Sequence, residues 1–313
     1  MSFRSFTLLM LSAVSTGILF SSLYAQTTLP LASVPSTAAS ATASDAPINF
    51  DDFFINKALR LEIYQVGNHD QEIVSLNKIY EEPIWPENPR NVIAPFDACR
   101  YDMKVYDLAS GRLLFVHPFD GLFGEYRTTD PAIKGIQGVY PKSLRIPEPK
   151  KPVRFVIENR DKKLHLKELY SLTIRPDDYH IIRENVNQGD VTFVQQKTGD
   201  PHDKVDLAFL AEGYLAADQD KFKNDVAKMT TALFSYEPYK SNKDRFNIYG
   251  VFRASPERGM DEPVQHGYKT TALGATYNTF DTDRYLTIQD DHAIYRMAAQ
   301  VPFDTAVVLV NTA

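Results

Sequence analysis

From Ile48 to about Gln196, apolar and polar residues alternate in short runs of the kind that form half-buried β-strands. The clearest run extends from Leu59 to Gln65, where every second side chain belongs to the same predicted face. Because strand side chains point alternately to opposite sides, we expect one face of this strand in a core and the other in solvent. Prolines cluster between the runs, where they end strands and protect sheet edges.

Two pairs of extended runs predict β-hairpins. Residues 101–106 and 112–117 flank a short turn in which Gly111 suits a positive φ. Residues 152–158 and 163–174 flank a second turn, Asn159-Arg160-Asp161, and residues 191–195 predict a further short strand. Short strands with frequent turns are typical of a β-sandwich, so residues 48–196 are predicted to form a β-sandwich accessory domain.

After Gly199 the pattern changes from alternation to longer apolar runs. The runs at 205–210, 246–252 and 305–310 predict strands that are buried on both faces. Predicted helices separate them, which gives the order of an α/β unit with a largely parallel sheet. The predicted fold class is therefore α+β with two domains, an N-terminal β-sandwich followed by an α/β domain.

The two helices of this second domain are predicted at 217–234 and 287–301 from apolar stripes with helical spacing. Thr287 with Asp290 resembles a capping box at the start of the second helix. The stripes consist of Phe222, Val226, Met229 and Leu233 in the first helix and of Ile294, Met297, Ala298 and Val301 in the second.

The sequence ends at Ala313, directly after the third predicted strand of this domain. A buried parallel strand normally leads into a crossover helix that covers one face of its sheet. We therefore expect residues 200–313 to be the N-terminal part of a larger domain.

The N-terminus has the features of a signal peptide. Arg4 precedes an apolar stretch from Phe6 to Phe20, and small residues lead to a plausible cleavage site after Ala25. The alternative, a short membrane anchor, is less favoured because the stretch is short for a bilayer span. Residues 1–25 are thus a predicted signal peptide and residues 26–47, rich in Ser, Thr, Ala and Pro, a predicted flexible linker.

The signal peptide predicts an exported protein, periplasmic or extracellular, and charges interrupt every later apolar run, so we expect no stable membrane span after signal cleavage. The formal net charge of the 313 residues is -6, and loss of residues 1–25 removes one arginine and no acid. An acidic surface disfavours nucleic acid as a partner. Cys99 is the only cysteine, which excludes an internal disulfide, and we expect it to be a small core residue.

Local catalytic motifs are absent from the sequence. Zinc peptidases commonly carry two histidines four residues apart on a helix, with a glutamate after the first. None of the seven histidines has a second histidine at that spacing or a glutamate directly after it. No serine-nucleophile elbow, Walker loop or dinucleotide-binding glycine motif occurs either. We expect no catalytic residue and no catalytic metal ligand in this chain.

Four polar residues remain as candidates for the rim of a cleft. Glu212 follows a predicted parallel strand, at the edge of the sheet where open α/β folds bind ligands, although a carboxylate at a helix start is the simpler account. Asp261, Glu262 and His266 lie in a loop after the second such strand, where they suit a cleft rim, a calcium site or plain solvated chain.

Four segments of the last third of the chain resemble the IgA-type metallopeptidases, family sixty-four of the metallopeptidases. The segments are VDLAFLAEGY (205–214), ALFSYEPYKSNKDRFNIYGVF (232–252), TTALGATYNTFDTDRYLT (270–287) and VPFDTAVVLVNT (301–312). Their common order makes the resemblance more specific than any single segment. The preceding β-rich region resembles the sandwich domain that stands before the peptidase domain in this family.

The resemblance implies a secreted, zincin-like zinc endopeptidase that hydrolyses protein or peptide substrates. In the family, a helix of the form His-Glu-Phe-Gly-His follows the strand that corresponds to residues 306–310 and supplies zinc ligands and the general base. No position of this chain matches that helix, so the sequence predicts a truncated, inactive chain, either a fragment or the product of a frameshift or stop. The alternative is a non-catalytic exported β-sandwich that binds glycan or protein. The chain has 17 tyrosines, and tyrosine side chains suit surfaces that bind polar ligands.

Overall fold

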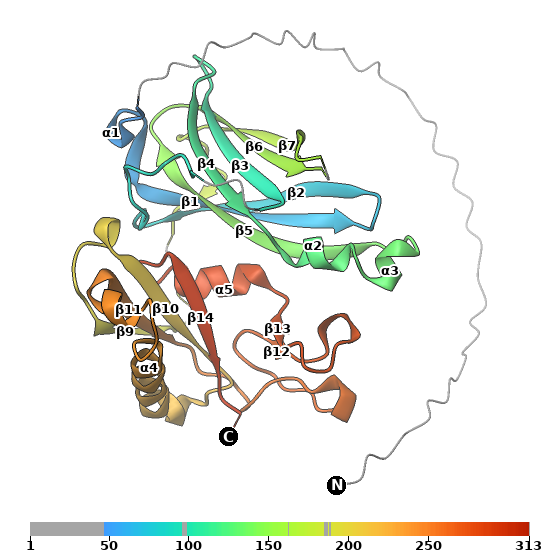
Figure 1. Cartoon of the computed structure of the whole chain (residues 1–313), viewed down its shortest axis with the longest axis vertical. Coiled ribbons are helices and arrows are strands. Elements are labelled where there is room, and N and C mark those ends of the chain that lie inside the picture. Colours follow the sequence, from blue (N-terminus) through green and yellow to red (C-terminus); the bar gives the residue numbers. More distant parts are fainter. Residues whose placement is uncertain (1–46, 96–98, 162, 185–186, 188, 313) are drawn as a thin grey trace. The chain divides into compact units, whose positions relative to one another are not determined.

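The computed structural model describes residues 47–95, 99–161, 163–184, 187 and 189–312. The predicted signal peptide, and the predicted linker except Pro47, lie outside the described residues. The described part is rich in β-sheet, has few helices and forms one compact unit (Figure 1). No helix in the described part is both long and apolar enough to cross a membrane.

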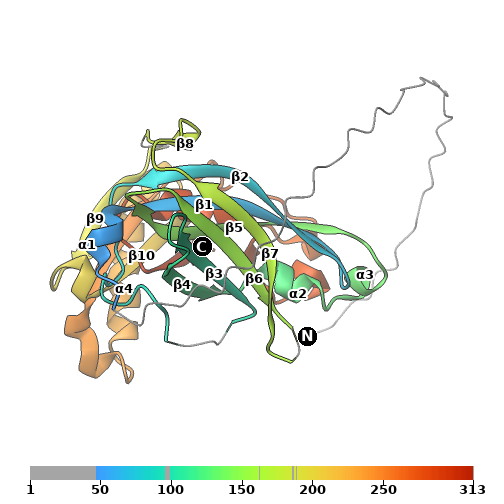
Figure 2. The ribbon, with the colours of Figure 1, turned by 90° about the horizontal axis from the view of Figure 1, so that it is seen from above.

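Two four-stranded sheets build the N-terminal half. The first, sheet A, has the order β5-β1-β2-β8, and the second, sheet B, has the order β4-β3-β6-β7. Figure 2 shows β1, β2 and β5 running alongside one another. The strand bounds are β1 Phe54–Gly67, β2 Glu72–Glu82, β3 Tyr101–Asp107, β4 Leu113–Phe119, β5 Gly138–Pro149, β6 Val153–Arg160, β7 Leu166–Ile174 and β8 Ile181–Ile182. The short helices are α1 Phe50–Phe53, α2 Leu122–Tyr126 and α3 Asp130–Ile133.

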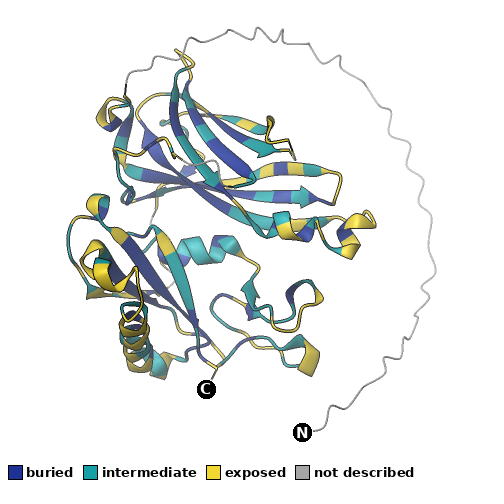
Figure 3. Ribbon diagram, viewed as in Figure 1, coloured by how far each residue is buried: buried dark blue, intermediate teal, exposed yellow. Residues whose placement is uncertain are grey.

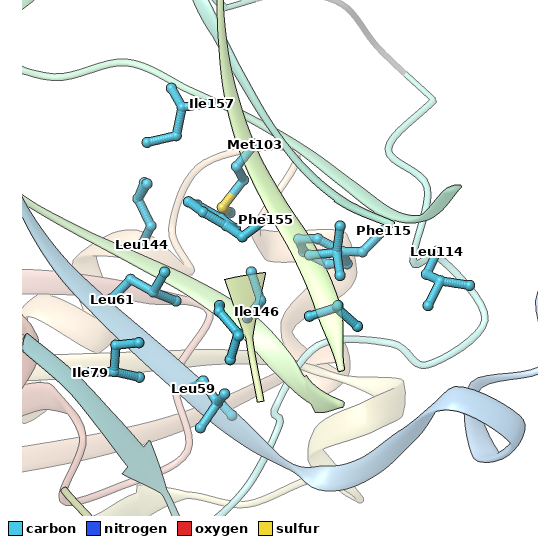
Figure 4. Close-up of a cluster of buried hydrophobic side chains, with 14 of the residues drawn as sticks. Leu59, Leu61, Ile79, Met103, Leu114, Phe115, Leu144, Ile146, Phe155 and Ile157 are labelled. Atoms are coloured by element: carbon cyan, nitrogen blue, oxygen red, sulfur yellow. The ribbon is translucent and has the colours of Figure 1, made fainter. Parts of the chain in front are cut away.

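Side chains from sheets A and B form one hydrophobic cluster, as expected for two sheets packed face to face (Figure 4). Leu59, Leu61 and Ile63 of β1 are fully buried in it, together with Phe155 and Ile157 of β6. Both predicted hairpins are confirmed, and Gly111 has the expected positive φ of 71°. In the second hairpin, Asn159 and Arg160 are paired within β6 and are not part of the turn. The expected solvent face of β1 is wrong in its central part, since every residue from Leu59 to Ile63 is buried.

A third sheet, sheet C, builds the C-terminal half in the order β14-β10-β11-β9. Strand β10 (Val205–Glu212) pairs in parallel with both β11 (Phe246–Phe252) and β14 (Thr305–Val310), which confirms the predicted parallel sheet. The connecting helices are α4 (Gln219–Leu233) and α5 (Asp291–Ala298). Figure 3 shows β10 as buried along most of its length, as expected for a central strand.

The last strand of the predicted sandwich belongs to sheet C instead. Strand β9 (Val191–Gln196) pairs antiparallel with β11, and Phe193 lies opposite Gly250. A Cβ atom on Gly250 would lie 2.2 Å from the Phe193 ring, so the ring rests directly on the glycine. The alternation of residues 191–195 predicted the strand but held no information on its pairing partner.

The helices also differ from the predictions. In α4, Met229 is 45% exposed and Thr230 is buried in its place, because the buried face follows Phe222, Val226 and Thr230 at steps of four. Helix α5 begins at Asp291 rather than Thr287, and its N-cap is Asp290, which accepts a hydrogen bond from the Ala293 N–H.

Thr287 lies in β13 (Thr287–Ile288), which pairs with β12 (Ala275–Thr276), so the predicted capping box does not form. Cys99 is a free thiol and half-buried rather than a core residue, and burial raises its pKa.

Candidate functional site

Residues 253–290 connect β11 to α5 and contain only β12, β13 and short 3₁₀ turns. This segment begins at the carboxyl-terminal end of β11, the edge of sheet C where open α/β sheets bind ligands. All four candidate residues of the sequence analysis belong to this edge or to this segment.

Glu212, the last residue of β10, is fully buried and fixes the segment to the sheet. Its Oε1 accepts hydrogen bonds from the Thr271 hydroxyl at 2.5 Å and the Ala275 N–H at 2.8 Å. Its Oε2 accepts one from the Leu273 N–H at 2.7 Å. Three donors from residues 271–275 thus occupy this carboxylate, which is directed to the loop and not to the start of a helix.

Ser255 provides a second attachment beside Glu212. Its hydroxyl oxygen accepts hydrogen bonds from the Gly213 N–H at 2.9 Å and from the Ala272 N–H at 3.0 Å. Gly213 has a φ of +70°, and a Cβ atom there would lie 2.3 Å from the Gly259 carbonyl oxygen. Only glycine fits this close approach. The sequence analysis missed Ser255, because a serine after a strand has no distinctive pattern.

Asp261 holds the same loop from its other side. Its backbone N–H donates to the Ala275 carbonyl at 2.9 Å, and its Oδ1 accepts from the Lys269 N–H at 2.6 Å. The structure therefore brings Glu212 and Asp261 together around Ala275. Both act as structural acceptors that shape the segment.

Glu262 and His266 lie on the outer side of this turn. The Glu262 N–H donates to the Gly267 carbonyl at 2.8 Å, and the Glu262 side chain lines a pocket of about 290 Å³ with Tyr277 and Asp283. His266 is exposed, in a left-handed conformation with φ of 55°. These two residues do not join Glu212.

Two family models match the chain one after the other. Residues 49–171 match the model described as Peptidase M64 N-terminus, and residues 194–313 match IgA Peptidase M64. The chain belongs to the M64 peptidase family. The resemblance noted in its last third is thereby confirmed, and M64 is a family of metallopeptidases. Among curated proteins, no match to the chain was found.

The described residues of this M64 chain do not fit a catalytic metal. A zinc site needs three or four His, Cys or carboxylate side chains within bonding distance of one point. Within the described ranges, no group of three or more His, Cys, Asp or Glu side chains is suited to a metal ion. The Nε2 atom of His202 lies 2.9 Å from the Trp85 carbonyl oxygen, so this ring contacts the protein backbone.

Helix α5 of the M64 peptidase domain packs against sheet A of the M64 N-terminal domain. The His292 ring is buried, and its Nε2 lies 3.0 Å from the Ile63 carbonyl oxygen of β1. Asp291 accepts a hydrogen bond from the Ser143 N–H of β5 at 2.6 Å. On the other side of α5, Met297 and Ala298 pack into the core of sheet C. The helix is therefore a layer that both domains share.

Glu62 of β1 is the centre of this contact. The carboxylate is fully buried, accepts two hydrogen bonds from Arg296 of α5, and also pairs with Arg60. Burial by itself raises the pKa of the Glu62 carboxyl, but the hydrogen bonds from Arg296 and the charges of Arg60 and His292 outweigh it, so that pKa lies below its ordinary value. The expected solvent face of β1 is thus buried at Arg60 and Glu62.

Proposed function

We propose that the chain is part of an exported zinc metallopeptidase that hydrolyses peptide bonds. The observation that carries this proposal is the pair of M64 matches in consecutive order, N-terminal domain first and peptidase domain second. In this proposal residues 1–25 direct export, residues 26–47 are a linker, and residues 48–196 are the accessory domain. Residues 200–313 are the first part of a zincin-like peptidase domain.

Zinc in such an enzyme polarises the substrate carbonyl and activates a water molecule. Since the described residues do not fit the metal, we propose that its ligands and the general base come from a His-Glu-x-x-His helix outside residues 1–313. In this proposal residues 1–313 by themselves are an inactive part of the enzyme. This assignment is supported by the seven histidines, none of which has the required spacing.

The role of the chain's own residues is to build and hold the wall of the cleft. Sheet C supplies a rigid edge, and Glu212, Ser255 and Asp261 fix the segment 271–275 upon it through buried hydrogen bonds. Sites placed on such rigid supports keep reacting groups in position. The substrate class in this proposal is protein or peptide.

The test uses the gene together with its downstream DNA. We expect a reading frame after codon 313, direct or shifted, to encode a His-Glu-x-x-His helix. The longer product should cleave casein in a chelator-sensitive manner, and a Glu→Gln change in that motif should abolish cleavage. The proposal is wrong if no frame encodes the motif, or if the longer product cleaves equally well with the motif changed.

A further inference from the structure

Residues 277–286 form a loop between β12 and β13 that reaches from the peptidase domain to the N-terminal domain, and we call this loop the strap. Its two ends are held together because β12 pairs antiparallel with β13. The hydroxyl groups of Thr279 and Thr287 form a further hydrogen bond of 2.6 Å just inside this pair. The strap is therefore closed at its base, and the residues near its tip decide where it lies.

Two side chains attach the strap to the N-terminal domain. The Phe280 ring packs against the apolar cluster of Phe123, Tyr126 and Ala132. Its centroid lies 6.1 Å from that of the Tyr126 ring in α2. The Tyr285 hydroxyl donates a hydrogen bond of 2.6 Å to a carboxylate of α2, that of Glu125. Phe280 and Tyr285 thus fasten the peptidase domain to α2.

The backbone of the strap is strained where it presents Phe280. Asn278, Phe280 and Asp281 have φ values of 59°, 55° and 58°, in the left-handed region. Asparagine and aspartate tolerate this region, whereas a bulky side chain such as phenylalanine is an outlier there. Such a conformation persists when the surroundings of the residue over-determine it. The contacts of the Phe280 ring therefore hold the backbone in this conformation.

Two opposing effects decide the position of the strap. Burial of the Phe280 ring favours the fastened position, and relaxation of the left-handed backbone favours release. These two free energies are of the same order, because the ring is half-buried and not fully buried. Residues 281–284 are exposed, so their side chains add little burial to the fastened position. A small change in either effect is therefore sufficient to shift the equilibrium.

A pocket of about 540 Å³ lies at the base of the strap, where the two domains meet. Thr287 and Ile288 of β13 line one wall, and Leu122 and Glu125 of α2 line another. Glu125 is also the acceptor for the Tyr285 hydroxyl. The strap therefore links two walls of the pocket, one from each domain.

We propose that the strap has two positions and controls access to this pocket. In the fastened position, which the structure shows, Phe280 lies against the cluster of α2. In the released position Phe280 lies in solvent, the backbone is relaxed and the pocket is open. Release leaves the rest of the segment in place, because the β12–β13 pair and the hydrogen bonds of Glu212 to residues 271–275 lie outside the strap.

Hydrogen exchange of single amides in the full chain tests the two positions. The Thr279 N–H donates to the Tyr285 carbonyl at 3.2 Å and the Tyr285 N–H to the Thr282 carbonyl at 2.8 Å, so both amides report on the strap. Phe280→Ala removes the ring that fastens the strap. We expect it to reduce the protection of both amides about tenfold or more, while the amides of β10 keep their protection.

A matched pair of glycine variants tests the strain separately. Asp281→Gly removes the cost of a left-handed residue and should raise the protection of the two amides about twofold or more. Thr282→Gly lies at an extended residue with φ of -111°, where glycine adds freedom without relieving strain, and should lower the protection. Both positions are exposed, so these variants keep the test valid if Phe280→Ala does not fold.

Thiol labelling tests access to the pocket. In a Cys99→Ser chain, Leu122→Cys places the one thiol in the lining, and iodoacetamide should alkylate it about fivefold or more faster when Phe280→Ala is added. Equal alkylation rates would overturn the proposal. Unchanged protection in folded Phe280→Ala, or a change of the same sign in both glycine variants, would overturn it as well.

Discussion

Arg296 of α5 donates two hydrogen bonds to Glu62 of β1, from Nε to Oε1 at 2.8 Å and from Nη2 to Oε2 at 2.5 Å. The residues are far apart in the sequence and belong to different M64 domains. Because the acceptor is fully buried, the pair fixes the helix of one domain onto the sheet of the other. We interpret the two domains as one cooperative structure.

The first prediction concerns this pair. Glu62→Ala should lower the free energy of unfolding by about 3–5 kcal/mol, because it leaves buried cations without their carboxylate. Arg296→Ala should cost less, since Arg60 still pairs with Glu62.

A double-mutant cycle in urea should give a coupling energy of about 1 kcal/mol or more between the two positions. Independent effects of the two changes, or two separate unfolding transitions in the unaltered chain, would contradict the shared role of α5.

The second prediction concerns Asp304, just before β14. Burial is the main cause that raises the pKa of its carboxyl from 3.8 to about 7. Between those pH values the folded chain holds a proton that the unfolded chain has lost, so stability falls as pH rises through this window. Asp304→Asn keeps an acceptor for the Asp206 N–H and removes the buried charge.

We therefore expect Asp304→Asn to be more stable than the unaltered chain by about 1–3 kcal/mol at pH 8, with the gain shrinking toward pH 4. Urea unfolding at a series of pH values measures this. The exposed Asp70→Asn serves as the control and should show no such pH dependence. A gain for Asp304→Asn that is equal at pH 4 and pH 8 would exclude this explanation.

The third prediction concerns Glu212. In the unaltered chain, the donors of the loop meet the Glu212 carboxylate. Glu212→Gln replaces one carboxylate oxygen by an amide N–H donor that faces these donors, so we expect the free energy of unfolding to fall by about 2–4 kcal/mol. Hydrogen exchange should become faster at Leu273 and Ala275, whose N–H groups donate to this carboxylate. Unchanged protection of these amides would show that Glu212 does not hold the loop.

The fourth prediction tests whether β9 belongs to sheet C. Gly250→Ala should cost about 1–3 kcal/mol, because the new methyl group meets the Phe193 ring. Gly124→Ala is the control, since the nearest atom to its Cβ would be 4.0 Å away. The smaller side chain of Phe193→Leu should relieve part of the loss at Gly250. Equal effects of the two glycine changes would argue against the β9–β11 pairing.

Local pattern was sufficient to predict most of the strands. Alternation in β1 identified Leu59, Leu61 and Ile63 as core residues, and the apolar runs gave β11 and β14 with their observed bounds. These signals depend only on which side chains must leave water. The order of four sequence segments in the last third of the chain was also sufficient to predict the family.

What the sequence could not show depends on contacts between distant segments. Glu62 has the pattern of a solvent-facing residue, and only the position of α5 explains its burial. His292 likewise lies on the polar side of α5 and is buried against β1. In α4 the choice between Met229 and Thr230 depends on the exact rotation of the helix against sheet C.

The role of the four candidate residues at the rim of a cleft stays a prediction. Glu212 and Asp261 do lie at the carboxyl edge of sheet C, as parallel strand order implies. Their hydrogen bonds to residues 269–275 could not be foreseen, because loop conformation has no periodic signal. Ser255 was missed for the same reason.

The most direct test of the proposed function is a zinc-dependent proteolysis assay on purified residues 26–313. We predict that, with one equivalent of zinc, this protein shows no chelator-sensitive cleavage of casein. The reason is that we assign no zinc ligand to residues 26–313. Chelator-sensitive cleavage by this chain alone would contradict the proposal that the catalytic ligands lie elsewhere.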